Sequence, residues 1–204
     1  MVCIKKIINT LSIACLTVAD APVKENSPMD AHYIARFDDK IQGFIEFSTT
    51  SERTVMVHVN LSGLPAEGGP FPYHVHVLPV PSDGDCYGTL GHLNPYNGSE
   101  AAERPAAKEV GDLSGKHGPI TDQSFQTSYI EQYLSLNKDD SAYVGNRSVV
   151  IHFANDTRLI CANITSNSNS SHASSTIPTA NAAVLNGFSP GPAGAAAAAL
   201  GLLI

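Results

Sequence analysis

The sequence predicts an all-β domain of the sandwich or barrel type between residues 31 and 164. Short runs in which apolar and polar residues alternate recur along this stretch, and turn-favouring residues separate them. Strong helix signals are absent from the same stretch. Many short strands joined by turns are typical of β-sandwiches and β-barrels.

Three runs near the start predict three neighbouring strands. In the third run alternate residues share a face, so Val55 and Val57 point inward while His58 and Asn60 point outward. We therefore interpret His58 as a surface residue. The three runs are HYIARF at 32–37, IQGFIEFS at 41–48 and TVMVHVNL at 54–61.

A fourth strand is expected within PYHVHVLP, at residues 72–79. His74 and His76 are two residues apart, so on a strand they point to the same face and could bind one metal ion. Two further strands are predicted later in the body, in GNRSVVIHF at 145–153 and TRLICANI at 157–164. His152 ends the apolar run of the first of these.

The strand pattern lapses between Pro79 and Val110, where glycine, proline and polar residues dominate. A loop of this length inside a compact domain is usually functional. It contains Cys86 and His92. Four histidines could therefore converge, His74, His76, His92 and His152, and imidazole suits copper, zinc, iron or nickel. The alternative is that they are scattered core or surface residues.

Both ends of the 204-residue chain indicate export. Residues 1–21 have a basic start, an apolar stretch and small residues at Ala19 and Ala21, as in a secretory signal peptide. Residues 165–181 form a Ser/Thr/Asn-rich stalk, and residues 182–204 end in an apolar tail too short to span a bilayer. Small residues from Asn181 onward predict GPI attachment there, with Asn186-Gly187 as another candidate site, which would anchor the protein to the outer membrane leaflet. The alternative is a disordered alanine-rich tail.

Six glycosylation sequons support an extracellular location. The net charge of −7 and the lack of a basic run after Lys6 give no reason to expect nucleic acid as a partner. Cell-wall glucan is a candidate partner at the cell surface. The sequons begin at Asn60, Asn97, Asn146, Asn155, Asn163 and Asn169.

Cys3 and Cys15 lie in the expected signal peptide, which leaves Cys86 and Cys161 in the mature chain. In an oxidising compartment two thiols are expected to form one disulfide. Closing a loop of about 75 residues would contribute about 4 kcal/mol in the chain-entropy description.

The motifs HVH, GHLNP, EVGDLSG, GNRSVVIH and TRLICA follow one another along the body of the chain. In this order and setting they resemble the copper/zinc superoxide dismutase family. The resemblance covers residues 31–164 and implies a Greek-key barrel of eight antiparallel strands, an immunoglobulin-like sandwich architecture with a long metal-site loop. We place the domain at 22–164.

The resemblance also implies roles for single residues. The copper ligands would be His74, His76, His92 and His152, and the loop-tethering disulfide would be Cys86–Cys161. The active-site arginine would be Arg158.

The chain departs from the family at the zinc site. The segment from Asn94 to Leu113 contains no histidine, Glu109 stands where the family has a zinc histidine, and only Asp112 persists among the other zinc ligands. One shared imidazole and one carboxylate do not make a four-coordinate zinc site. Only five residues separate His152 from Arg158, where the family has a long charged loop. The chain lacks both the zinc histidines and the long charged loop, and in this it resembles the copper-only, secreted or GPI-anchored superoxide dismutases of fungi. One copper and no zinc are therefore expected.

The implied reaction converts superoxide to dioxygen and hydrogen peroxide. His92 would bind oxidised copper and take up a proton on reduction, Glu109 would hold its far ring nitrogen, and Arg158 would attract the anion. A structural cell-wall protein or a copper-binding protein without turnover is the alternative. We interpret His117 as structural or surface, on a strand following VGDLSG, and His32 and His172 as incidental.

Overall fold

The computed structural model describes residues 20–167. The expectations for the signal peptide up to Ala19, for the stalk beyond Asn167 and for the GPI segment concern residues outside this range, as do those for Asn169, His172 and Asn181. No helix among residues 20–167 is long and apolar enough to cross a membrane.

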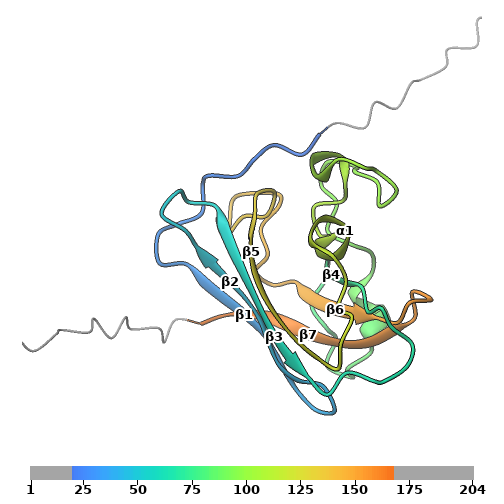
Figure 1. Ribbon diagram of the computed structural model, residues 1–204. Coiled ribbons are helices and arrows are strands. Elements are labelled where there is room, and N and C mark those ends of the chain that lie inside the picture. Colours follow the sequence, from blue (N-terminus) through green and yellow to red (C-terminus); the bar gives the residue numbers. More distant parts are fainter. Residues whose placement is uncertain (1–19, 168–204) are drawn as a thin grey trace, which may run out of the picture. The chain divides into compact units, whose positions relative to one another are not determined.

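Seven strands form one antiparallel sheet in this part of the chain (Figure 1). The strand order is β4-β6-β7-β1-β2-β3-β5, so β7 returns beside β1, and β3 pairs with β5 rather than with β4. The strands are β1 (His32–Asp38), β2 (Gln42–Thr49), β3 (Val55–Ser62), β4 (Tyr73–His76), β5 (Ser124–Glu131), β6 (Ser148–His152) and β7 (Arg158–Ser166).

Alternation along the strands builds the core. Val55, Val57 and Val59 are fully buried, and Leu61 is 1% exposed, while the residues between them face outward. On that outer face His58 Nδ1 lies 2.7 Å from the Ser128 hydroxyl of β5. The inward and outward sides of β3 are therefore those expected from the sequence.

The prediction of an all-β fold is confirmed, but the described residues form seven strands rather than eight. The segment after Asp112 forms a short helix, α1 (Leu113–His117), in place of a further strand. The Asp112 side chain accepts a hydrogen bond from Gly115 N at 2.6 Å, and Gly118, with φ of 94°, ends the helix. The expectation that His117 lies on a strand is wrong, because this capping closes a helical turn there.

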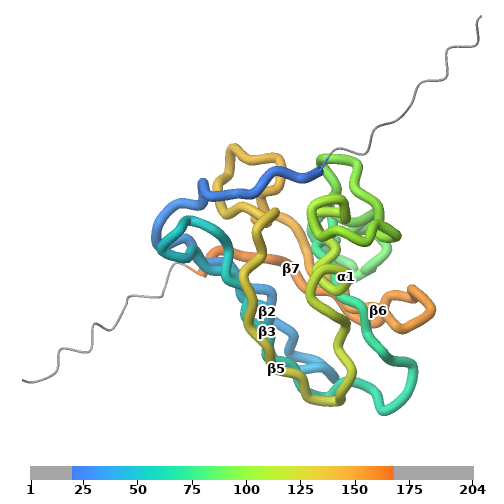
Figure 2. Tube along the Cα trace, turned by 45° about the horizontal axis from the view of Figure 1, so that its top comes forward, coloured from blue at the N-terminus to red at the C-terminus, as the bar shows by residue number. Residues whose placement is uncertain are grey.

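The long loop after β4 lies beside β6 and α1, away from β1 and β2, in both views of the molecule (Figures 1 and 2). It contains two 3-10 turns, η1 (Cys86–Thr89) and η2 (Pro105–Ala107). The expected disulfide between Cys86 and Cys161 is present, with an S–S distance of 2.06 Å. It joins η1 to β7 and so fixes the loop against the sheet.

Candidate metal centre

Strand pairing brings three of the four candidate histidines together. β4 pairs with β6 so that Tyr73 lies opposite Ile151 and His74 opposite Val150. His76 follows two residues later on the same face of β4, and His152 ends β6 at a bulge. An isolated bridge between His76 and His92 adds the loop histidine to this group.

The four imidazoles form one compact cluster. Their pairwise ring-centroid distances run from 3.9 Å, between His74 and His92, to 6.4 Å, between His74 and His76. One nitrogen from each ring lies within 4.8 Å of the corresponding nitrogens of the other three. This is the spacing of groups that can share one metal ion.

Each ring has its other nitrogen close to a protein oxygen. His76 Nδ1 lies 2.8 Å from Leu90 O, His152 Nδ1 3.0 Å from Asp156 O, and His92 Nδ1 2.6 Å from Glu109 Oε2. His74 is reversed, with Nε2 3.5 Å from Asp112 Oδ1. An oxygen at one ring nitrogen places the proton there and leaves the lone pair of the other nitrogen for a metal.

The fit to a metal can be tested at His74. Its Nδ1 is buried and has no hydrogen-bond partner. Such an atom is costly unless something binds it, and a metal ion shared by the cluster would supply that partner. Burial lowers the pKa of His76 to about 3, with Leu90 O opposing the shift and the other imidazoles adding to it. Burial likewise lowers the pKa of His152 to about 4. Neutral imidazoles are the form that binds copper or zinc.

His92 is held from behind by carboxylates. Glu109 Oε2 is 2.6 Å from its Nδ1, and Glu100 Oε1 is 2.9 Å from the same nitrogen. The Glu100 side chain is 61% exposed and that of Glu109 only 20%. Asn94 Nδ2 donates to Glu109 Oε1 at 3.0 Å, so this carboxylate is held on both oxygens.

Asp112 has a different position from Glu109. It caps α1 and lies 3.9 Å from Lys108 Nζ, and its remaining contact in the site is with His74. The His74 contact and the capping hydrogen bond help to hold its pKa below the usual value, although burial opposes the shift. Asp112 therefore supports a ring on the strand side of the cluster and does not contact His92.

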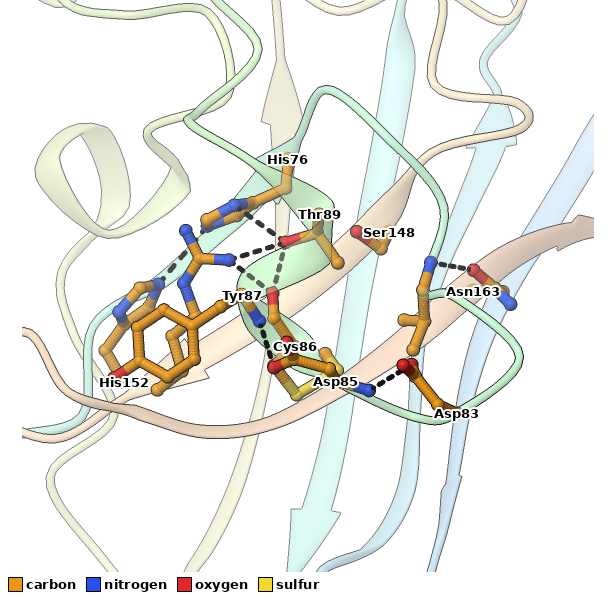
Figure 3. Close-up of a disulfide and its surroundings, with 12 residues drawn as sticks. His76, Asp83, Asp85, Cys86, Tyr87, Thr89, Ser148, His152 and Asn163 are labelled. Carbon is orange, nitrogen blue, oxygen red and sulfur yellow. Dashed lines mark hydrogen bonds between the residues drawn. A yellow bond between two sulfur atoms is a disulfide. The ribbon is translucent and has the colours of Figure 1, made fainter.

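Arg158, the first residue of β7, lies at the edge of the cluster. Its guanidinium donates to Cys86 O, to Leu90 O and, at 3.0 Å, to Thr89 Oγ1. The Tyr87 ring covers it at 4.9 Å. Figure 3 shows Tyr87, Thr89, His76 and His152 gathered around this point. A cavity of about 420 Å³ opens here, lined by Arg158, the carboxylates and three of the histidines.

The remaining histidines among residues 20–167 lie apart from this cluster. His117 Nε2 is 2.8 Å from Glu131 Oε2, and its ring stacks on Tyr129 with centroids 3.8 Å apart. Lys116 Nζ reaches the same carboxylate at 3.1 Å. Burial alone would raise the pKa of Glu131, but the Lys116 ammonium and the hydrogen bond with His117 hold it below the usual value. His32 contacts Glu46 on the surface of β1 and β2.

Sequence reasoning missed three residues that the structure adds to the site: Asn94, Glu100 and Thr89. Asn94 lies within the GHLNP motif, so the motif itself carried a signal. For Glu100 and Thr89 the sequence gave no such signal, because the approach of Glu100 to His92 and of Thr89 to Arg158 depends on the path of the loop.

The fold and the cluster define an all-β protein with a four-imidazole metal centre and an arginine beside it. The family profile described as Copper/zinc superoxide dismutase (SODC) matches residues 41–177. The chain belongs to this family.

Particular relatives are cell-surface proteins of Candida albicans. The chain is 48% identical over 165 residues to cell surface superoxide dismutase [Cu-Zn] 4, covering 78% of this chain and 71% of the relative. It is 49% identical over 150 residues to cell surface Cu-only superoxide dismutase 5, covering 72% and 66%. The solved structure of superoxide dismutase 5 with Cu(II) matches with a TM-score of 0.65 and 50% identity, over 68% of this chain and 93% of that one.

Proposed function

We propose that this protein is an extracellular superoxide dismutase that converts superoxide to dioxygen and hydrogen peroxide at a copper-only site. The observation that carries the proposal is the cluster of four imidazoles, one nitrogen of each within reach of a shared metal ion, beside the Arg158 guanidinium. A copper store would need the imidazoles but would have no use for the arginine.

His74 would hold copper through Nδ1, and His76, His92 and His152 through Nε2, because these are the nitrogens that the protein's own oxygens leave available. Copper, when bound, would supply the one-electron chemistry that superoxide disproportionation requires. Three of these histidines come from β4 and β6, so their rings are held by the sheet.

His92 is the ligand suited to proton transfer. Its Nε2 would hold a proton in the reduced half of the cycle, while Nδ1 keeps its hydrogen bond to Glu109. Glu109 would fix the ring's orientation and basicity in the position where family members have a zinc ligand. Asp112 would do the same for His74, at a longer distance.

Arg158 would attract and orient the anionic substrate. The net charge of −7 makes the overall field of the protein unfavourable for an anion, so a local positive charge at the site is needed. A zinc site of the family's kind is not expected, because Asp112, which alone persists among the family's other zinc ligands, caps α1.

We place the mature protein at the cell surface, with the dismutase domain at 22–164, the stalk at 165–181 and a GPI anchor at Asn181. β7 reaches Ser166, two residues beyond the expected boundary. Asp20 pairs with Arg104 at 2.6 Å, and Ala21 N donates to Ala106 O at 2.7 Å. The sequence allows signal cleavage after Ala19 or, less readily because of Pro22, after Ala21. These contacts favour cleavage after Ala19, which would leave Asp20 and Ala21 ahead of the domain in the mature chain. Contact with cell-wall glucan stays a proposal.

The exposure of the sequons supports glycosylation. All five within residues 20–167 have an exposed asparagine: Asn60, Asn97, Asn146, Asn155 and Asn163.

The deciding experiment measures superoxide dismutation by the purified, copper-loaded protein. Copper-dependent dismutation is expected. Copper binding without dismutation would favour a copper-binding protein without turnover, and the absence of copper binding would favour a structural wall protein.

A further inference from the structure

Thr89 lies between the arginine and a histidine of the cluster (Figure 3). Its hydroxyl oxygen is 3.0 Å from Arg158 Nη1 and 3.1 Å from His76 Nδ1. The hydroxyl also donates to Cys86 O at 2.8 Å, across η1. Thr89 ends this 3-10 turn, which the disulfide ties to β7.

Every hydrogen-bonding position of the Thr89 hydroxyl is used. A hydroxyl has one proton to donate and two lone pairs that accept. The proton goes to Cys86 O, and the lone pairs face the guanidinium and the imidazole. Thr89 is fully buried, so solvent water has no direct access to replace a lost partner.

Main-chain oxygens accept the other hydrogen bonds of these two groups with the loop. Leu90 O accepts from both the His76 ring and the Arg158 guanidinium, and Cys86 O accepts from Arg158. Thr89 therefore contributes a side-chain oxygen, which a substitution can remove while the main-chain contacts remain. The effect of the Thr89 hydroxyl on Arg158 can therefore be measured while the main-chain hydrogen bonds from the loop stay in place.

We propose that Thr89 is a positioning residue, whose hydroxyl fixes the Arg158 guanidinium relative to His76 and so sets where a small anion sits beside the metal centre. The inference rests on the proposed function, because it assigns Arg158 to the substrate anion. Without the hydroxyl, one N–H of Arg158 loses its acceptor, and the guanidinium can rotate within its remaining contacts toward Tyr87.

The test compares Thr89→Val, which keeps the shape and removes the hydroxyl, with Thr89→Ser, which keeps the hydroxyl. Thr54→Val is the matched control, because Thr54 is a buried threonine outside the cluster, immediately before β3, whose hydroxyl is hydrogen-bonded to that of Thr50 at 2.7 Å. Each protein is loaded with copper(II), its copper content is measured, and it is titrated with azide, a small monoanion, by visible absorption. Superoxide dismutation is measured in parallel.

Thr89→Val is expected to keep its copper and to bind azide about tenfold more weakly, the lower end of what supporting residues contribute at metal sites. Thr89→Ser and Thr54→Val should bind azide as the wild type does. Equal azide affinity in Thr89→Val and wild type would overturn the inference, as would equal weakening in Thr89→Ser. If Thr89→Val does not fold, Thr89→Ala compared with Thr89→Ser carries the same test.

The parallel rates separate the two proposals. An active wild type with no azide difference in Thr89→Val overturns the role of Thr89 alone. An inactive wild type that binds azide, with weaker binding in Thr89→Val, overturns the dismutase function but supports the positioning of Arg158 by Thr89.

Discussion

The two sides of the histidine cluster differ in how they are held. On the strand side, His74, His76 and His152 are 7%, 1% and 5% exposed and are fixed by β4 and β6. On the loop side, His92 and Glu109 have side chains 14% and 20% exposed, and their positions depend on contacts within the long loop. The rigid, buried histidines of the strand side are suited to retaining a metal ion. His92 is partly exposed and hydrogen-bonded to a carboxylate, so it is suited to exchanging a metal ion for a proton during turnover.

This difference also locates the chain's departure from zinc-containing members of its family. The strand side keeps three of the four implied copper ligands, and the loop side keeps His92 but has Glu109 in place of a zinc ligand. We therefore expect substitutions on the strand side to remove copper, and substitutions on the loop side and at Arg158 to slow turnover with less loss of copper.

The largest effect is expected from His152→Ala on the strand side. This substitution removes one proposed ligand nitrogen and opens a gap among buried rings. Copper retention should therefore fall by more than about 10- to 100-fold, the typical loss when a residue that only supports a metal ligand is removed. Copper content after dialysis measures this. His117→Ala, which removes a histidine outside the cluster, should retain copper; similar losses in both variants would contradict the assignment.

Arg158→Glu should leave copper content nearly unchanged and slow dismutation by on the order of 10- to 1,000-fold, because it replaces an attractive charge with a repulsive one. Rates by stopped-flow and copper by elemental analysis separate the two effects. Added salt should slow the wild type only modestly, since contacts within the Debye length of about 8 Å escape most screening. Unchanged activity would show that another cation attracts the substrate.

Glu109→Ala should lower activity or copper retention by about 10- to 100-fold, because the His92 ring loses its better-buried acceptor. Glu109→Gln keeps an oxygen in reach and should lose less. Fold stability, followed by thermal unfolding, should change little. Rates equal to wild type at equal copper loading across the pH range would remove Glu109 from the mechanism and leave it as a solvated loop residue.

The smallest effect is expected from Asn94→Ala, which removes the donor to Glu109 Oε1 but leaves the contact with His92. A hydrogen bond to a charged group is worth about 1.5–3 kcal/mol, and only part of this should be lost from the transition state while the carboxylate stays near the ring, so turnover should slow by about two- to tenfold. The Asn94 side chain also bonds with Gly98 N and O, within the loop. The rate at matched copper content is the measurement. A larger loss than in Glu109→Ala would mean that Asn94 acts through the loop's fold instead.

The sequence predicted the strand side better than the loop side for a physical reason. Alternation along a strand fixes which residues share a face, so His74 and His76 could be paired before the structure was known. The positions of β1, β2 and β3 followed from the same alternation, within a residue or two at each end.

Contacts in the loop cannot be predicted in this way, because its residues do not alternate regularly between two faces. The approach of Glu100 to His92 and of Thr89 to Arg158 depends on tertiary contacts of the loop, which the local sequence pattern does not encode. The helix α1 was missed because Asp112, first recognised as a family zinc ligand, serves as its N-cap. The strand β5 was missed because its alternation is weak: the half-buried positions include Thr127, and the exposed positions include the apolar Ile130.

The claim that copper binds without zinc is tested most directly by metal analysis. The purified protein is incubated with both copper and zinc, dialysed, and measured for each metal per chain alongside its dismutation rate. One copper, no stoichiometric zinc and full activity are the expected result. One tightly held zinc per chain in addition to copper would contradict the account, and His92, Glu100 and Glu109, which lie close enough to share an ion, would be the first residues to examine for it.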